Sequence, residues 1–364
     1  MTSWKIFRNS GVLAIAWLGA GCATLFATRV QADEEVIFYP TFARKIEGGT
    51  TVTIHGNVNE PEKGSFIQDR TLSFMRPEYV KTPEEKSIYE RRARPFLVDN
   101  QRWKKIQISI AGKTLEMESS LANGHFYTDI TENSETFVPA NHRLTFQAVL
   151  PGGDGRNFPG EILFIRPTGP IIVSDIDDTI KLSDVRNRDE LMRNTFARPF
   201  RATPGMPAFY RQLSEVAAGF YYVSASPWQL YPELQAFNRA ENYPAGAFCM
   251  KYFRLKDSDF FNLFQKPFDY KLATIEPIIK SNPGRSFILI GDSGEKDPEA
   301  YAELAKRFPE QVASIWIRLA YGDEAARFEG LQKNLRPGVL QTFNLPLEIR
   351  DPLRLPVLRA AESR

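Results

Sequence analysis

Hydrophobic and polar side chains alternate along much of the chain between about residues 34 and 167. Val52, Ile54 and Val58 have polar neighbours, and residues 106 to 110 repeat the pattern before an Ala-Gly-Lys turn. A period of two is typical of strands that bury one face. Asn-Gly, Pro-Gly and Gly-Gly pairs separate further short apolar runs. This half is therefore predicted to form an antiparallel sandwich or barrel of about six or seven strands.

One helix is predicted inside this β-rich half. The stretch Thr82-Pro83-Glu84-Glu85 offers an N-cap, a first-turn proline and an acidic first turn, and Pro95 ends the helix. Three arginines follow, at positions 91, 92 and 94. An isolated charge cluster favours a solvated helix face over a site for an acidic partner.

The pattern changes after Pro167-Thr168-Gly169-Pro170, where short apolar strands begin to alternate with helices. Strands are expected at 171–174, 219–224, 286–291 and 312–318, and helices near 206–217, 227–240, 270–281 and 297–308. Such alternation predicts an α/β fold, a parallel sheet with helices on both faces, preceded by the β-rich sandwich-like domain. We divide the chain into a signal peptide (1–32), the β-rich domain (33–167), the α/β domain (168–340) and a C-terminal tail (341–364).

The first 32 residues have the pattern of a secretory signal peptide. Two basic residues precede an apolar segment from 11 to 27, and Val30-Gln31-Ala32 is a small-residue cleavage pattern. We expect cleavage after Ala32 and export to the periplasm or the cell exterior, with membrane association open. The alternatives are a lipid anchor at Cys22 and a retained helix, although about 17 apolar residues is at the short limit for a bilayer span. After cleavage no transmembrane segment is expected.

Removal of this segment changes the charge and the cysteine content. Loss of Lys5, Arg8 and Arg29 with no acid lowers the formal net charge from +2 to −1. No basic surface for nucleic acid is then expected. Cys249 remains as a single cysteine, which excludes an internal disulfide. The three histidines, at 55, 125 and 142, all precede the α/β half, so we expect neither a histidine zinc site nor a Ser-His-Asp triad within that half.

Polar residues stand at the carboxyl ends of three predicted strands, where ligands bind in an α/β sheet. Lysine 271 opens the helix before the third of these strands. Each motif alone predicts only a turn or a helix cap. Their order along one chain instead predicts a reaction centre. Its members are Asp175, Asp177 and Thr179 after the first strand, Ser224 and Ser226 after the second, Lys271, and Asp292 with Asp297 after the third.

This combination suits phosphoryl transfer. Asp175 and Asp177 leave the strand on the same side, so Asp175 is expected to attack phosphorus while Asp177 acts as acid and base. Two carboxylates facing a phosphate dianion require a cation, and we predict Mg²⁺ with Asp292 as a further ligand. Ser224 and Ser226, with the helix start behind them, and Lys271 are expected to bind the phosphate oxygens. Asp178 is assigned no role.

The motifs resemble those of haloacid dehalogenase (HAD) superfamily phosphatases. The strings "SDIDDTIKLSDV", "YVSASPWQLYP" and "FILIGDSGEKDPEAY", with the lysine at 271, more narrowly resemble the catalytic domain of actin-patch-protein-type phosphatidate phosphatases. The resemblance covers about residues 165 to 325, and a "YPTF" string at 39–42 also suits the family. It implies a HAD-like fold and Mg²⁺-dependent conversion of phosphatidate to diacylglycerol at a membrane surface. It further implies that Thr179 supports its loop and that Asp175, Asp177, Asp292 and Asp297 form the metal site.

Three questions stay open at this level. The aromatic segment "DSDFFNLFQKPFDY", residues 257–270, could receive acyl chains, or its rings could simply pack on the sheet. The charged segment 181–204 is interpreted as a flap that excludes water. A soluble phosphomonoester is the alternative substrate, and a secreted β-sandwich binding protein with a vestigial phosphatase domain is the alternative outside enzymes. Protein partners cannot be named.

Overall fold

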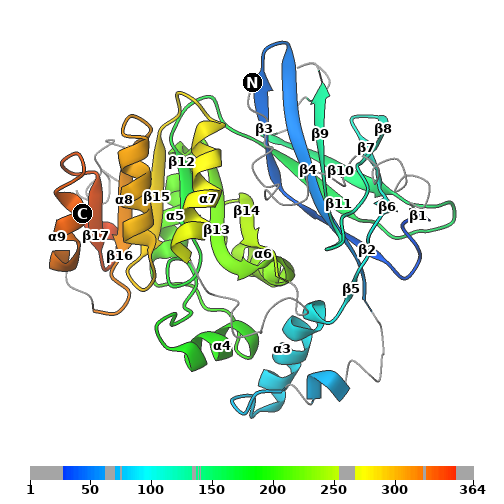
Figure 1. Ribbon diagram of the computed structural model, residues 1–364, viewed down its shortest axis with the longest axis horizontal. Coiled ribbons are helices and arrows are strands. Elements are labelled where there is room, and N and C mark those ends of the chain that lie inside the picture. The colour runs from blue at the N-terminus through cyan, green and yellow to red at the C-terminus, as the bar shows by residue number, and fades with distance from the viewer. Residues whose placement is uncertain are drawn as a thin grey trace, which may run out of the picture.

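The computed structural model describes residues 28–61, 70–73, 76–132, 141–253, 267–322 and 325–349, together with Phe137 and Pro139. These residues form two regions that lie side by side (Figure 1). One is an α/β region with a six-stranded sheet, and the other is a β-rich region with a nine-stranded sheet. The predicted fold class is therefore confirmed.

The sheet of the α/β region has the order β14-β13-β12-β15-β16-β17, and all its neighbouring strands are parallel. The central strand β12 is buried along its whole length, as expected for a strand covered on both faces. The strands are β12 (Ile171–Asp175), β13 (Gly219–Pro227), β14 (Ala247–Lys251), β15 (Phe287–Asp292), β16 (Val312–Arg318) and β17 (Leu340–Phe343).

Helices cover both faces of this sheet, and all four predicted helices are confirmed within a few residues. The apolar residues of α5 (Met206–Val216) and α6 (Tyr231–Ala240) pack against one face. Those of α7 (Pro267–Lys280) and α8 (Asp297–Arg307) pack against the other. Alternate residues of each strand supply the two cores, because successive side chains point to opposite faces.

The structure adds elements that the pattern did not reveal. Helix α4 (Arg188–Phe196) lies within the segment interpreted as a flap, and α9 (Glu329–Gln332) and the edge strands β14 and β17 are further additions. β17 pairs with β16, so the sheet continues past residue 340, where we expected the α/β domain to end. β17 has only four residues, two of them half-buried, which is too little alternation to identify an edge strand from the sequence.

The β-rich region folds into two layers around one apolar core, as a sandwich does. Its sheet runs in the order β2-β4-β3-β11-β10-β7-β8, with β5 and β9 paired to β4. Pairing is antiparallel except between β11 and β3. The members are β2 (Glu35–Tyr39), β3 (Thr41–Ile46), β4 (Gly49–Glu60), β5 (Asp99–Asn100), β7 (Gln107–Ile110), β8 (Lys113–Glu116), β9 (His125–Glu132), β10 (Arg143–Val149) and β11 (Pro159–Phe164).

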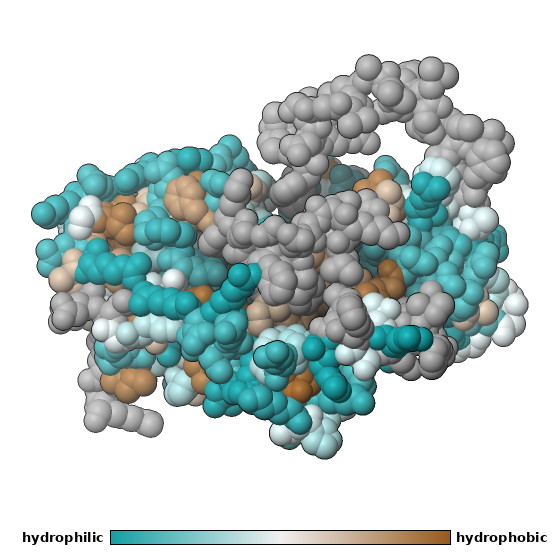
Figure 2. Space-filling view, turned by 60° about the horizontal axis from the view of Figure 1, so that its bottom comes forward, coloured by the Kyte–Doolittle hydropathy of each residue, from teal (hydrophilic) through white to brown (hydrophobic). Residues whose placement is uncertain are grey.

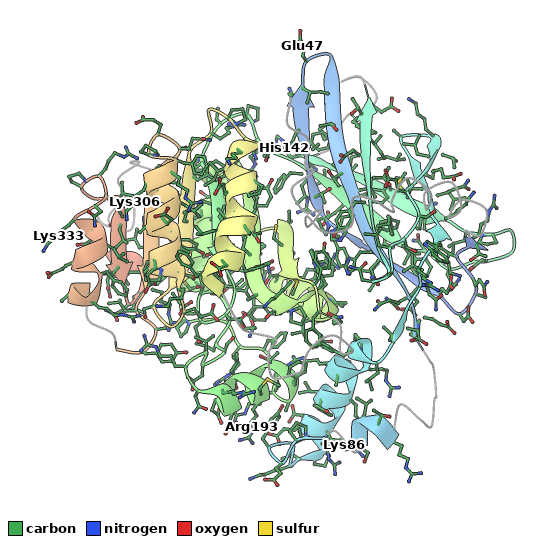
Figure 3. All side chains as sticks on the ribbon, viewed as in Figure 1. Glu47, Lys86, His142, Arg193, Lys306 and Lys333 are labelled. Atoms are coloured by element: carbon green, nitrogen blue, oxygen red, sulfur yellow. The ribbon has the colours of Figure 1, made fainter. Side chains whose placement is uncertain are left out.

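Helix α3 (Pro83–Ala93) begins as predicted, with a complete capping box between Thr82 and Glu85. The expectation of a solvated arginine face is wrong for Arg92, which is buried, whereas Arg91 stays exposed although it also has an acidic partner. Arg91 and Arg92 both bind Glu233 of α6, and Arg92 also donates to the carbonyl of Thr195 at 2.8 Å. In Figure 3 the labelled Lys86 and Arg193 mark α3 and α4, which lie together below the sheet. The sequence could not show this, because it does not reveal which helix meets which.

The N-terminal prediction lies mostly outside the described residues, which begin at Thr28. Strand β1 (Thr28–Arg29) pairs with β6 (Lys104–Lys105), and Val30 is buried in the β-rich core. Cleavage after Ala32 would therefore remove a short strand and one core side chain. The tail beyond residue 349 is likewise outside the described part. Among the residues that are described, no helix is long and apolar enough to cross a membrane.

Candidate active site

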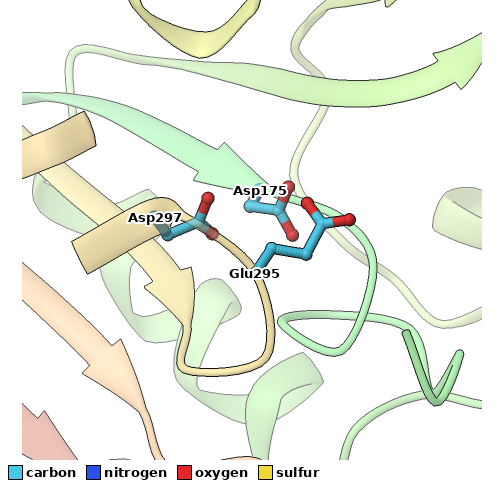
Figure 4. Close-up of side chains that lie close together, drawn as sticks. All are labelled: Asp175, Glu295 and Asp297. Atoms are coloured by element: carbon cyan, nitrogen blue, oxygen red, sulfur yellow. The ribbon is translucent and has the colours of Figure 1, made fainter. Parts of the chain in front are cut away.

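The carboxyl ends of β12, β13 and β15 meet at one edge of the sheet, and the predicted polar residues gather there. Asp175 is the last residue of β12, and Asp292 is the last residue of the neighbouring β15. Asp297 opens α8, and Lys271 projects from the first half of α7. Figure 4 shows Asp175 between Asp297 and Glu295, with its carboxylate on the side of Glu295, which comes from the loop between β15 and α8. The parallel topology thus brings together residues that are more than a hundred positions apart.

Lys271 is the cation at the centre of this cluster. It is completely buried, and its Nζ lies 2.9 Å from Asp175 Oδ1 and 3.3 Å from Glu295 Oε2 and also binds Asp297 Oδ1. Burial alone would lower the pKa of Lys271, but the neighbouring carboxylates hold it well above its ordinary value. The lysine is therefore charged, and it offsets part of the repulsion among the acids.

Within the predicted centre, two buried carboxylate oxygens have no hydrogen-bond partner among the described residues: Oδ2 of Asp175 and Oδ2 of Asp292. Burial raises the pKa of both carboxyl groups well above the ordinary value, and Lys271 opposes that rise. The other oxygen of Asp292 accepts a hydrogen bond of 2.5 Å from the backbone N–H of Gly294. Buried polar atoms without partners are costly, so these two oxygens indicate a missing ligand.

A hard divalent cation fits this donor set, because Mg²⁺ prefers carboxylate oxygens. Oδ2 of Asp175 and Oδ2 of Asp292 are the available ligand atoms. Asp175, Glu295 and Asp297 also lie close enough together to hold an ion, but Lys271 contacts all three. Asp297 uses both oxygens already, one for Lys271 and one for the N–H of Asp292. Of the four predicted ligands, Asp175 and Asp292 are therefore the two with a free side-chain oxygen.

The side chain of Asp177 lies in a different set of contacts. Its Oδ1 is 2.8 Å from Lys181 Nζ and accepts a hydrogen bond from Ser183. Its Oδ2 accepts hydrogen bonds from Ser224 at 3.1 Å and from Ser226 at 3.2 Å. Burial raises the pKa of this carboxyl, but Lys181 and the hydroxyls outweigh burial and bring it below the ordinary value. Asp177 is thus an ionised carboxylate between a buried lysine and the two serines predicted to bind phosphate.

The loop after β12 is held by Asp178, for which the sequence suggested no function. Its carboxylate accepts backbone N–H bonds from Ser183 at 2.8 Å and Val185 at 2.8 Å, and a further bond from the hydroxyl of Tyr321. Asp178 has a φ of 55°, which aspartate tolerates better than most residues. Thr179 is fully buried, and its hydroxyl has no partner among the described residues, so its predicted support of the loop comes from packing alone.

Gly291 allows β15 and α8 to approach each other closely. A Cβ atom at this position would lie 2.3 Å from Oδ2 of Asp297 and 2.7 Å from its Cβ. Any larger residue would therefore displace the carboxylate that binds Lys271. The Gly-Asp-Ser-Gly string thus serves packing as well as chemistry.

Sequence reasoning missed Lys181, Ser183 and Glu295 as members of the site. The signal was present for Lys181, because a lysine directly after an apolar strand-end loop is unusual unless it has a partner. It was weak for Glu295, which stands among three other charged residues. The aromatic segment 257–270 lies largely outside the described residues: Phe260, Phe261, Leu263 and Phe264 fall there. Phe268 and Tyr270 are described, and they pack against the core on the α7 side of the sheet, as the packing alternative expects.

Residues 171–319 match the family model described as "Phosphatidate phosphatase APP1, catalytic domain". Phosphatidate phosphatase APP1 of Saccharomyces cerevisiae is 34% identical over 201 residues, which cover 53% of this chain and 33% of the yeast protein. An uncharacterized protein of Schizosaccharomyces pombe is 29% identical over 229 residues, which cover 60% of this chain and 37% of that protein. The chain thus matches little more than a third of the length of these relatives. Residues 171–319 are thus similar to the catalytic domain of APP1-type phosphatidate phosphatases.

Proposed function

We propose that this protein is a Mg²⁺-dependent phosphatase that converts phosphatidate to diacylglycerol through a phosphorylated Asp175. The observation that carries the proposal is the buried Asp175 carboxylate. One of its oxygens lies 2.9 Å from Lys271 Nζ, and the other has no hydrogen-bond partner among the described residues. A nucleophile needs such a free lone pair, while a fixed cation limits the repulsion of an incoming phosphate. The family of residues 171–319 supports the substrate class.

In the first step Oδ2 of Asp175 forms a bond to phosphorus, and the bond from phosphorus to the glycerol oxygen breaks. Asp177 gives its proton to that oxygen, which releases diacylglycerol. In the second step water attacks the phosphorylated Asp175, Asp177 takes the proton, and inorganic phosphate leaves. Lys271 stays beside Asp175 throughout and offsets negative charge.

This sequence requires Asp177 to be protonated when substrate is bound. In the resting arrangement Lys181, Ser224 and Ser226 favour its ionised form. A phosphate dianion would compete for the same cation and hydroxyl groups. We infer that substrate binding transfers the serine hydrogen bonds from Asp177 to phosphate and leaves Asp177 free to hold a proton.

Asp292 would hold Mg²⁺ through its free Oδ2, and Asp175 would contribute the oxygen that does not attack phosphorus. When bound, the ion would neutralise charge on the phosphoryl oxygens and so lower the barrier to attack. Without a cation the two carboxylates would repel each other and the substrate.

A soluble phosphomonoester remains the second candidate substrate. On the face shown in Figure 2, hydrophilic residues predominate, and the hydrophobic residues that are coloured are scattered rather than gathered in one patch. Among its coloured residues, this face shows no apolar patch that would contact a membrane. The proposed contact with a membrane surface therefore rests on the similarity of residues 171–319 to phosphatidate phosphatases. The vestigial-site alternative is weaker, because every position of the predicted centre is filled.

We further propose that the protein is exported, on the basis of the charged, apolar and small-residue pattern of residues 1–32. Sequencing the N-terminus of the mature protein tests this. A new terminus at Asp33 is expected, a lipidated Cys22 would establish the anchored alternative, and an intact Met1 would exclude processing.

The deciding experiment compares the wild type with Asp175→Asn on phosphatidate in mixed micelles. Wild type should release phosphate and diacylglycerol in equal amounts, lose activity with EDTA and recover it with Mg²⁺. Asp175→Asn should lose at least about 10³-fold in turnover while keeping its fold by circular dichroism. Asp269→Asn, an exposed acid on α7, is the matched control and should behave as wild type. Turnover by Asp175→Asn at the wild-type rate would exclude the mechanism, and faster turnover of a sugar phosphate than of phosphatidate would favour the soluble substrate.

A further inference from the structure

Four aromatic rings meet where the β-rich region touches residues 224–227, the irregular end of β13, which we name the phosphate-binding turn. Tyr39 ends β2, His55 lies in β4, His125 begins β9, and Trp228 directly follows β13. The ring of Trp228 has its centre 4.2 Å from that of Tyr39, 4.9 Å from that of His55 and 6.1 Å from that of His125. We name these four residues the ring cluster. Three of its members therefore belong to the β-rich region and one to the α/β region.

The ring cluster packs as an uncharged unit. His55 Nε2 and His125 Nδ1 lie 3.0 Å apart, a distance at which one ring donates and the other accepts. Burial lowers the pKa of His55 well below its ordinary value and that of His125 to about 3, so both rings are neutral near pH 7. Tyr39 stacks on His125 with an interplanar angle of 19°. Trp228 thus rests on a rigid, neutral surface supplied by three strands.

Trp228 follows the serines that are predicted to bind phosphate, two residues after Ser226 and four after Ser224. The Ser226 N–H donates to Ser224 Oγ at 2.9 Å, which closes the turn. Pro227 lies opposite Lys251 of β14, so the sheet fixes the turn on one side. The ring cluster holds it on the other side, because Trp228 is only 5% exposed. The position of Ser224 and Ser226 therefore depends on contacts from both regions.

One side of the ring cluster is open. Tyr39, His125 and Trp228 border a cavity of about 420 Å³ between the two regions, together with Tyr252 and Phe253. Trp228 consequently has space into which it can move if a supporting ring is removed. Loss of one ring should then shift the turn without collapse of either core, since the neighbouring core residues keep their contacts.

We propose that Tyr39, His55 and His125 are positioning residues for the phosphate-binding turn, so that the β-rich region forms part of the catalytic unit. The inference rests on the proposed function, because Ser224 and Ser226 matter only if they bind phosphate. It gives the β-rich region a function in phosphate affinity that its own sequence does not suggest. None of the three residues needs to touch the substrate.

The test uses the full chain and the variants Tyr39→Leu, Tyr39→Phe and Phe146→Leu. Phe146 is a buried ring of the β-rich core that packs edge-on against Phe38, so Phe146→Leu matches the loss of a ring away from Trp228. Tyr39→Leu should raise KM for p-nitrophenyl phosphate and the inhibition constant of inorganic phosphate by about tenfold, with kcat changed much less. Tyr39→Phe keeps the ring and should stay near wild type. Phe146→Leu should lower the melting temperature without changing either constant.

Folded Tyr39→Leu with both constants within twofold of wild type would overturn the inference. So would an equal shift in Phe146→Leu, since general destabilisation would then explain the effect. If Tyr39→Leu does not fold, His125→Gln decides by the same criterion. If the wild type hydrolyses no phosphomonoester, the proposed function fails, and calorimetric titration of the same variants with inorganic phosphate still decides whether the ring cluster sets phosphate affinity.

Discussion

The active centre and the ring cluster bury polar groups by opposite means. In the centre, carboxylates stay close together because the charged Lys271 and Lys181 lie among them. In the ring cluster, two histidines stay close because burial keeps both neutral. Paired charges can exchange partners when a charged ligand binds. Neutral aromatic rings in contact only hold one another in place. Under the proposed function, chemistry takes place at the strand ends, and the junction between the two regions sets the geometry.

The largest effect is expected from breaking the charge balance of the centre. Lys271→Met leaves the buried carboxylates without their cation, and we expect turnover to fall at least about 10³-fold and the free energy of unfolding to fall by about 3–5 kcal/mol. Chemical denaturation and phosphate release measure the two quantities. Lys280→Met is the control, because its pair with Glu276 is exposed and should contribute less than about 1 kcal/mol. Equal stability of the Lys271 variant and the wild type would show that the centre is not balanced by charge.

A smaller loss is expected when the second buried lysine is removed. Lys181 is 1% exposed and lies 2.8 Å from Asp177, so Lys181→Met should free this carboxylate from its resting position. We expect turnover to fall by about 10- to 100-fold, less than for Lys271, because Asp177 retains its serine contacts. Steady-state kinetics on phosphatidate measure the change. Lys86→Met, an exposed lysine of α3, should leave the rate unaltered, and an unaltered rate in Lys181→Met as well would show that Asp177 needs no buried cation.

The ring cluster should make stability depend on pH. Unfolded histidine binds a proton below about pH 6.5, whereas the folded rings do not, and the folded pKa of His125 is about 3. The unfolded state thus gains protons as pH falls, so the free energy of unfolding decreases below pH 6.5. The decrease should reach about 2 kcal/mol for each histidine at pH 5. Denaturation of wild type and His55→Gln/His125→Gln at pH 7 and pH 5 measures it.

The carboxylates of the centre also titrate in acid and lower the stability of both proteins. The quantity to compare is therefore the change in the free energy of unfolding between pH 7 and pH 5, in the wild type and in the double variant. The double variant should be less sensitive to the change from pH 7 to pH 5 than the wild type is. The same sensitivity in both proteins would mean that the folded histidines take up protons readily, and the ring cluster could not then be the neutral surface described above.

The smallest effect is expected at a second junction between the two regions, where Glu85 of α3 binds Arg193 of α4 at 2.7 Å. Glu85→Gln weakens this partly exposed pair and the capping box of α3, so we expect a loss of about 1 kcal/mol. KM should not change, since neither helix carries the phosphate-binding turn. Thermal unfolding and steady-state kinetics together check this. A rise in KM as large as that in Tyr39→Leu would show that any contact between the regions, and not the ring cluster in particular, positions the turn.

Much of the α/β region could be predicted because its signals are local. Apolar runs near residues 171, 219, 286 and 312 each formed a strand, and the helices between them began close to the expected residues. The edge strands β14 and β17 were not predicted, because short edge strands carry little alternation. The predicted boundary of the α/β domain at residue 340 consequently cuts through β17, which continues the sheet to Phe343.

Contacts between the regions could not be predicted in the same way. Arg91 and Arg92 suggested a solvated face, yet both reach Glu233 across the junction. His55 and His125 are 70 residues apart, and only the pairing of β4 with β9 places them in contact. Such contacts depend on how the two folded regions pack against each other, and the hydrophobic pattern of the sequence carries no information about that packing.

The sequence by itself determined which residues reach the active edge, because parallel strands bring their carboxyl ends to one side whatever the details of packing. Asp175, Ser224, Lys271 and Asp292 follow from that rule. Only the tertiary structure decided how their charges are shared: Lys271 binds three carboxylates, while Asp177 turns to Lys181 and the two serines. It also decided that Tyr39 supports the turn that carries those serines. Topology fixes the edge of a sheet, but the partners of each buried group depend on distances of a few ångströms that only the packed structure defines.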